Sequence, residues 1–252
     1  MLGARIVIKR GSKGEAEKPF WISYADLMTA LMVLFLVVMS VALLAVTKTV
    51  SEVTKTVSEI ERQKAERERD ITKLLEEVEK AADRYPGVKV DKERNIIDFG
   101  DKARFDKAKS LLNADQARLL RAFAPEVLAI ARDELGQKWL KRVVVEGFAS
   151  PEGDYLYNLN LSLQRSQRVI CVLLAKQDPS EHAMTDAERE QIRDLFLVGG
   201  YSFNAAKYNS VTANYDESRR VELRLEFLGI GERRPATEAA PPGNFGKCAL
   251  EG

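Results

Sequence analysis

The sequence predicts a membrane-anchored protein in which one N-terminal transmembrane helix continues into a parallel dimeric coiled coil and then into an α/β domain. Three observations support this fold class: an apolar run from Phe20 to Val46, heptad spacing directly after it, and alternating β-rich and amphipathic segments from Val88 to about Ile230. A chain of 252 residues with one span has room for one soluble domain of about 140 residues. The expected divisions are residues 1–19, the span 20–46, the stalk 47–85, the domain 86–230 and the tail 231–252.

The apolar run is long enough to cross a membrane. At about 1.5 Å per residue, Phe20 to Val46 forms a helix roughly 40 Å long, against a hydrocarbon core of about 30 Å. A removable signal peptide fits poorly, because the apolar run is longer than the apolar region of signal peptides and no small-residue cleavage site follows it. Basic residues exceed acidic ones before the run: Arg5, Lys9, Arg10, Lys13 and Lys18 against Glu15 and Glu17. Positive charge marks the cytoplasmic side, so the N-terminus is expected inside and the C-terminal domain outside.

Asp26 is the one charged residue in the apolar run. A carboxylate within a span costs about 2.5–3.5 kcal/mol on insertion scales, and such residues generally mark ion pathways. The first interpretation of Asp26 is therefore an ion-carrying carboxylate. Two alternatives remain: a position at the membrane interface, since Asp26 lies six residues from Phe20, or a structural pair with a neighbouring helix.

A coiled coil is predicted after the span. The segment 47–53 (TKTVSEV) is repeated at 54–60 (TKTVSEI). Apolar residues follow a spacing of three and four along Val46, Val50, Val53, Val57, Ile60, Ile71, Leu74, Val78 and Ala81. β-branched residues at the a positions favour a parallel dimer, whereas Lys64 and Arg67 interrupt the seam and could fix its register or mark where the helices part. The alternative is an amphipathic helix that packs on another protein or on the membrane surface. Pro86-Gly87 should end the helix, with Tyr85 as the boundary.

The domain is expected to contain strands and helices in an order typical of an α/β sandwich. The predicted strands are Val88–Val90, Ile96–Phe99, Arg142–Phe148, Leu195–Ser202 and Arg220–Phe227, and the predicted helices are Ala114–Leu135 and Leu161–Lys176. A charged insertion, Asp178–Asp194, has helical or loop character.

Composition argues against several kinds of function. The net charge of +1 leaves no basic footprint for nucleic acid, so no direct nucleic-acid partner is expected. The single histidine, His182, cannot supply a histidine-based triad or a zinc site with several histidine ligands, and no glycine-rich phosphate loop follows a strand. We therefore expect neither an enzyme nor a bound metal or cofactor.

Two cysteines, Cys171 and Cys248, should both lie outside the cytoplasm, where disulfides persist. On the predicted helix Cys171 lies about 200° from Val169, away from the apolar face. A Cys171–Cys248 disulfide that straps the tail across the domain is predicted. The alternatives are an intermolecular Cys248–Cys248 link and two free thiols.

Two sets of motifs resemble known families. EGFASPEGDYLYNLNLSLQRSQRVI (146–170), GGYSFN (199–204) and SRRVELRLEF (218–227) resemble the OmpA-like peptidoglycan-binding domain. WISYADLMTALMVLFLVV (21–38) resembles the membrane helix of flagellar stator B subunits, the MotB group. The second resemblance implies that Asp26 accepts the translocated ion, with Thr29 as a nearby polar residue, and favours a proton over sodium.

The OmpA-like resemblance implies a site for the peptide stem of peptidoglycan. The family element Y-N-x-x-L-S-x-x-R falls on Tyr157, Asn158, Leu161 and Arg165, and its arginine binds a stem carboxylate. The family's G-H-T-D sequence, whose aspartate contacts diaminopimelate, is replaced here by a run that ends in Ser150, so Glu152 or Asp154 would have to supply that charge. The alternative is structural: the element caps and packs a helix that begins near Ser162, and Arg165 forms a surface salt bridge.

Together these features resemble the stator-like B subunits of Zorya anti-phage defence systems, the ZorB family. The Ser150–Gly153 loop (SPEG), the stalk fused to the span and the Pro/Gly/Ala-rich tail favour this resemblance. It implies a single-pass protein of the bacterial inner membrane with a periplasmic domain bound to peptidoglycan, and a homodimer surrounded by an oligomer of a MotA-like, ZorA-type subunit. The alternatives are a flagellar stator B subunit, a passive peptidoglycan tether, and an energy-transducing subunit of the ExbD and TolR type.

Overall fold

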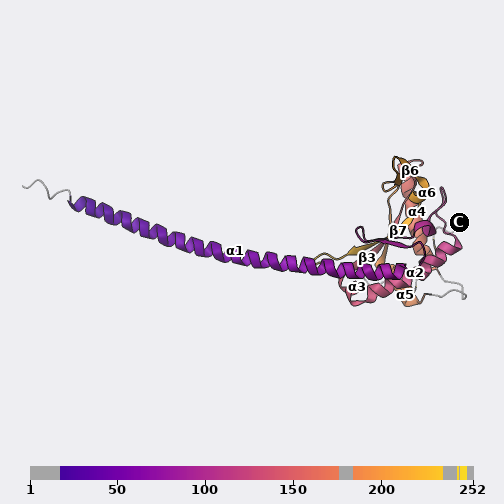
Figure 1. Cartoon of the computed structure of the whole chain (residues 1–252), viewed down its shortest axis with the longest axis horizontal. Coiled ribbons are helices and arrows are strands. Elements are labelled where there is room, and N and C mark those ends of the chain that lie inside the picture. Colours follow the sequence, from indigo (N-terminus) through magenta and orange to yellow (C-terminus); the bar gives the residue numbers. More distant parts are fainter. Residues whose placement is uncertain (1–17, 176–183, 235–242, 244, 249–252) are drawn as a thin grey trace, which may run out of the picture. The chain divides into compact units, whose positions relative to one another are not determined.

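The structure, a computed structural model, describes residues 18–175, 184–234, 243 and 245–248. It divides into two compact units, Met1–Arg62 and Gln63–Gly252, and helix α1 (Lys18–Ala82) contributes to both (Figure 1). Residues 1–17, with four of the five basic residues on which the predicted orientation rests (Arg5, Lys9, Arg10 and Lys13), lie outside the described part of the chain, and so does His182.

The first unit is the helical span and the start of the stalk. Among the described residues, α1 is the one helix long and apolar enough to cross a membrane, as the sequence predicts. The apolar residues of the stalk seam within this unit remain exposed on the single chain: Val46, Val50, Val53, Val57 and Ile60. These side chains are therefore available to a second helix.

The C-terminal part of α1 packs on its own domain, which corrects the predicted coiled coil. Leu74 and Val78 are each 1% exposed, Ala81 is also buried, and all lie against the domain rather than on a free seam. Leu74 and Val78 belong to one core cluster with Val127, Leu128 and Leu173. Periodicity reports that a helix face is buried and does not identify what covers it. The stalk therefore ends near residue 62, and the domain begins at Gln63 rather than at residue 86.

Polar contacts fix this last part of α1 on the domain. Arg67 Nε donates to the carbonyl of Leu228 (2.7 Å), which accounts for a basic residue at a seam position. Asp70 accepts hydrogen bonds from Trp139 Nε1 (2.9 Å) and Lys138 Nζ (2.9 Å). The hydrogen bond from Trp139 has the larger effect and that from Lys138 adds to it: both lower the pKa of the Asp70 carboxyl and keep it ionised. The interruption at Arg67 thus marks the place where α1 joins its own domain.

A five-stranded sheet forms the centre of the domain, in the order β1–β2–β7–β3–β4. The strands are β1 (Lys89–Asp91), β2 (Ile96–Asp98), β3 (Leu140–Gly147), β4 (Phe196–Gly200) and β7 (Val221–Phe227). β3 pairs with β4 in parallel and with β7 antiparallel, so the sheet is mixed. The segment between β3 and β4, which contains two helices, makes the crossover that a parallel pair requires. The predicted strands are all present, and their ends differ from the predicted ones by at most two residues.

The helices are α2 (Ala114–Arg132), α3 (Glu134–Trp139), α4 (Tyr155–Leu174) and α5 (Asp186–Leu195). Two helix predictions were wrong in detail. The single helix predicted for this region is interrupted at Asp133, which separates α2 from α3, and α4 begins six residues before its predicted start. The sequence analysis missed a 3₁₀ turn η1 (Gly100–Ala103), a hairpin of β5 (Lys207–Asn209) and β6 (Thr212–Asn214), and α6 (Tyr215–Ser218).

Gly147 lets α4 lie close to the end of β3. A Cβ at this position would come within 2.0 Å of the Ser162 carbonyl oxygen, so a larger residue would push the helix away. The next residues, Phe148, Ala149 and Ser150, are buried beside α4. This close approach places the end of β3 and the start of α4 in one site.

Candidate functional site

Asp26 and Thr29 lie one turn apart on the same face of α1. Thr29 Oγ1 donates to the backbone carbonyls of Ala25 (3.0 Å) and Asp26 (2.9 Å), so its proton is held by its own helix and its lone pairs remain free. The same face continues through Ala30, Val33 and Val37 in a shallow groove. Both predicted ion-carrying side chains are exposed on the isolated helix, and an acid among small and apolar residues requires a polar partner within a membrane.

Arg165 is the one charged residue of the element Tyr157–Arg165, and it is fully buried. Its side chain is 0% exposed, and its guanidinium donates to three backbone carbonyls: Phe148 (2.7 Å), Lys109 (3.0 Å) and Asp106 (3.2 Å). It also lies 5.1 Å from the centre of the Phe105 ring. Burial lowers the pKa of Arg165 to about 10, so it remains charged at neutral pH. Arg165 thus joins the loop before α2 to the end of β3.

This burial corrects the roles predicted for most of the motif. Asn158 is 2% exposed and donates to the Glu152 carbonyl (2.8 Å), and Leu161 is 7% exposed in the α4 packing. Neither they nor Arg165 offers a surface to a ligand in this arrangement. For Asn158 and Leu161 the structure agrees better with the alternative in which the element packs its helix. Arg165 does not form the surface salt bridge of that alternative, because it is buried. Tyr157, 52% exposed, is the member of the motif that remains on the surface.

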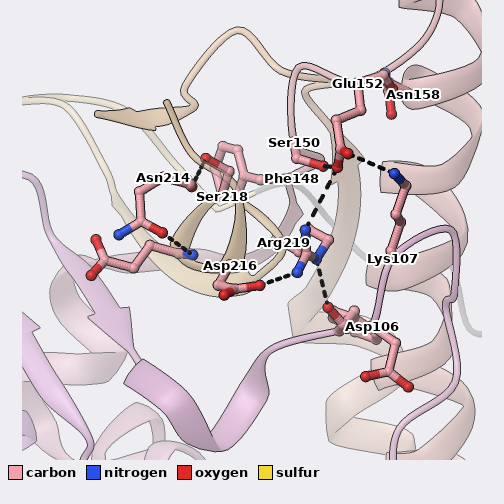
Figure 2. Close-up of polar contacts among 12 residues, drawn as sticks. Asp106, Lys107, Phe148, Ser150, Glu152, Asn158, Asn214, Asp216, Ser218 and Arg219 are labelled. Atoms are coloured by element: carbon pink, nitrogen blue, oxygen red, sulfur yellow. Dashed lines mark hydrogen bonds and ion pairs between the residues drawn. The ribbon is translucent and has the colours of Figure 1, made fainter. Parts of the chain in front are cut away.

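Glu152 gathers the charged groups of the site (Figure 2). Its carboxylate accepts hydrogen bonds from Lys107 Nζ (2.8 Å) and Ser150 Oγ (2.9 Å), and it lies 3.7 Å from Arg219 Nη1. The hydrogen bond from Lys107 and then that from Ser150 lower the pKa of the Glu152 carboxyl, so it is ionised at neutral pH. The sequence left Glu152 and Asp154 as alternatives to the missing aspartate. The structure brings Glu152, not Asp154, to the buried Ser150.

Lys107 and Arg219 are site residues that the sequence analysis missed. Arg219 donates to the Phe105 carbonyl through Nε (3.0 Å) and pairs with Asp216, so its guanidinium is held in one orientation (Figure 2). Lys107 lies on the loop that Arg165 anchors from both sides. The Ser218–Phe227 motif already contained Arg219, whereas nothing in the local pattern around Lys107 marks it. Its position depends on contacts distant in sequence.

Cys171 and Cys248 form a disulfide in the structure, with their Cα atoms 5.5 Å apart. This is the predicted intrachain pairing, and it ties the described end of the tail to α4. Gly243 N donates to Glu190 (3.2 Å), and the Phe245 ring lies 5.8 Å from the Arg189 guanidinium. The tail thus also contacts α5.

The chain is similar to proteins of known identity along nearly all of its length. It is 44% identical over 235 residues to the "Zorya protein ZorB" of Escherichia coli O139:H28 (strain E24377A / ETEC), covering 93% of this chain and 91% of that protein. The chain belongs to the ZorB family. Residues 7–54 also match the family described as "Membrane MotB of proton-channel complex MotA/MotB". This ZorB family member thus combines a MotB-type membrane segment with a C-terminal α/β domain.

Solved structures with a related backbone come from cell-wall and stator proteins. The cell wall anchor of the type VI secretion system (T6SS) from Pseudomonas aeruginosa is 20% identical, with a TM-score of 0.40 over 60% of this chain and 96% of that chain. The periplasmic domain of Helicobacter pylori MotB (residues 78–256) is 16% identical, with a TM-score of 0.36 over 52% and 74%.

Removing the disulfide should destabilise the domain of this ZorB family member. Closing a loop of this length constrains the unfolded chain, so Cys171→Ser with Cys248→Ser should lower the free energy of unfolding by about 2–4 kcal/mol. Urea unfolding with and without reductant measures this difference. Peptide mapping without reductant should recover a Cys171–Cys248 peptide; complete alkylation of both cysteines, or a covalent dimer through Cys248, would contradict the pairing.

Proposed function

We propose that this chain is the B subunit of an ion-driven stator-like motor of a Zorya anti-phage defence system, anchored to peptidoglycan by its outer domain. The single observation that carries this proposal is the similarity to ZorB over 93% of the chain, which includes both the membrane acid and the outer domain. A passive tether would leave Asp26 within the span without a function. Removal of the Asp26 charge tests the proposal, because Asp26→Asn should abolish ion carriage and with it protection against phage.

The membrane step is assigned to Asp26. We propose that a MotA-like, ZorA-type oligomer surrounds two copies of α1, that each Asp26 takes a proton from the periplasmic side, and that it releases the proton inward. Neutralisation changes the contacts of the carboxylate with the surrounding helices and can bias a two-state rotation. The membrane potential supplies about 2.3 kcal/mol per charge per 100 mV. Thr29 Oγ can accept a hydrogen bond from the protonated acid or its partner, because its own proton is already donated.

The stalk is proposed to pair with a second copy as a parallel coiled coil between about residues 46 and 60. The exposed valines at the predicted a positions, Val50 and Val57, are 58% and 48% exposed on the single chain. Burying such a stripe is the usual driving force for helix pairing.

A cysteine cross-link tests the pairing. Val50→Cys in the full chain in membranes should give a disulfide-linked dimer on non-reducing electrophoresis, because a residues of a parallel dimer face each other. Lys55→Cys, on the outer f position of the same heptad, is the matched control and should remain monomeric. Equal cross-linking at both positions would argue against a defined coiled coil.

The wall site is proposed to bind a zwitterionic group of the peptide stem. In this proposal Glu152 would receive an ammonium, and Lys107 and Arg219, which pair with Glu152 in the unbound domain, would receive a carboxylate beside it. Tyr157 lies at the start of α4 near this cluster and offers an exposed ring. Arg165 acts here as a positioning residue, since it holds the Lys107 loop through backbone carbonyls.

Substitutions at Lys107 and Arg219 should reduce wall binding without unfolding the domain. Arg219→Gln and Lys107→Gln should each weaken retention on purified sacculi about tenfold, because each removes a charged hydrogen-bond donor. Arg118→Gln is the control, since among the residues that the structure describes Arg118 on α2 pairs with the exposed Asp115 alone. Sacculus co-sedimentation with circular dichroism separates binding from folding. Unchanged retention in both site variants would move the wall site elsewhere on the domain.

A further inference from the structure

A second charged pocket lies beside the wall site and is not used by it. The pocket has a volume of about 510 Å³ and lies between the turn after α1, the turn η1 and the segment around α6. Its basic lining residues are Lys89, Lys102, Arg104, Lys207 and Arg220. Three acidic residues, Asp98, Asp101 and Glu217, also line it, so the basic groups are in excess.

Two of the basic groups are already neutralised within the domain. Arg220 Nε donates to the buried Glu222 (2.6 Å), and the guanidinium lies 4.2 Å from the centre of the Phe148 ring. Arg104 pairs with Asp101 (2.6 Å) and approaches Glu217 (3.9 Å). These two arginines form a fixed wall of the pocket.

The lysines are differently placed. Lys207 lies 4.0 Å from Glu222, at the limit of an ion pair. Within the described part of the chain, the ammonium groups of Lys89 and Lys102 have no hydrogen-bond or ion-pair partner. Clustered lysines that lack a carboxylate partner repel one another and favour a bound anion.

Two glycines bring the walls of this pocket together. Gly87, in the turn after α1, has a φ of +94°, and a Cβ there would lie 3.3 Å from Cγ of Lys102. Gly100 has a φ of +54°, and a Cβ there would approach the Gly87 carbonyl oxygen to 2.8 Å. Both positions therefore favour glycine sterically. The stem of Lys102 therefore lies against the turn, and Lys102 and Lys89 line the same pocket.

We propose that this pocket is a second anion site of the domain and takes a carboxylate of a peptidoglycan stem, bound by Lys89, Lys102 and Lys207. The inference rests on the proposed attachment to the wall. Arg104 and Arg220 line the pocket and pair with each other through an isolated backbone β-bridge, whereas the adjacent Arg219 contacts Glu152. Adjacent stems, or two carboxylates of one stem, would then be bound on both sides of this bridge.

Titration of the full chain in detergent with a purified monomeric muropeptide tests this site. Lys89→Gln with Lys102→Gln should weaken binding about tenfold. Lys73→Gln with Lys80→Gln, a pair on α1 outside the pocket, makes the same change of charge and should leave the affinity unchanged. Amidation of the muropeptide carboxylates should weaken binding to the parent chain. The loss of affinity caused by amidation should be smaller in the Lys89/Lys102 variant. Circular dichroism verifies that both variants are folded.

The outcomes separate this inference from the proposed wall attachment. Equal affinities for the two lysine pairs, with a loss in Arg219→Gln, would overturn the second site and leave the wall function standing. Absence of muropeptide binding by the parent chain would overturn both. A third outcome concerns inorganic phosphate. If phosphate binds the parent but not the Lys89/Lys102 variant, while both bind the muropeptide equally well, the pocket is a phosphate site and the proposed stem carboxylate is overturned.

Discussion

Asp26→Asn should abolish protection against phage in cells that carry this chain with its A-type partner. Asparagine keeps the size of the side chain and removes the group that titrates, so the complex should assemble but carry no ion. Protection is expected to fall to the level of cells without the system. Plaque assays measure this loss, and co-purification with the A-type subunit verifies assembly.

Asp115→Asn provides the matched control for this experiment. Asp115 lies on the exposed start of α2, and its nearest cation is Arg118 on the same helix. The same chemical change there should leave protection intact, because exposed pairs of this kind contribute little to stability. Full protection by an assembled Asp26→Asn variant would remove ion carriage by Asp26 from the account.

Arg165→Ala should destabilise the domain rather than remove a ligand contact. It leaves three carbonyls without their charged donor and opens a cavity under Phe105, so the free energy of unfolding should fall by about 3 kcal/mol or more. Trp139 is the one tryptophan after residue 62 and contacts Asp70, so its fluorescence reports urea unfolding of residues 63–252.

Arg165→Lys and Arg118→Ala define the specificity of that result. Lysine keeps the charge but cannot reach three carbonyls with one fork, so it should recover part of the stability. Arg118→Ala should change the unfolding free energy by less than about 0.5 kcal/mol, because its partner is exposed. A fully stable Arg165→Ala domain that has lost sacculus binding would restore the role that the sequence motif predicts for Arg165.

The sequence predicted those parts of the fold that leave a local pattern. The span follows from an apolar run, and β3 and β7 follow from β-branched and alternating residues. The heptad spacing of α1 is equally regular, and it predicted pairing with a second copy of the chain along the whole stalk. Leu74 and Val78 pack on the domain and not on a second copy, and spacing cannot distinguish the two. Arg67 was the residue that marked the change.

Elements that depend on short or unusual local sequences were missed. The β5–β6 hairpin turns at Ser210, which has a φ of +61° and lacks the Asn-Gly or Asp-Gly signal of such turns. The start of α4 was missed because Tyr155–Asn160 mixes polar and apolar residues without a helical apolar stripe, and most of them are exposed. The sequence motif assigns the proposed wall site to a segment, but which side chains of that segment face outward depends on burial. Arg165 and Arg219 could not be distinguished before the structure placed one inside and one near the surface.

Ion flux through the reconstituted complex tests the central claim most directly. The chain would be purified with its A-type partner, placed in liposomes with an internal pH dye and subjected to a membrane potential. Proton entry should occur with the parent, should fall to background with Asp26→Asn, and should not change when sodium is replaced by potassium. Equal flux in the parent and the variant, or flux that requires sodium, would contradict a motor driven by protons through Asp26.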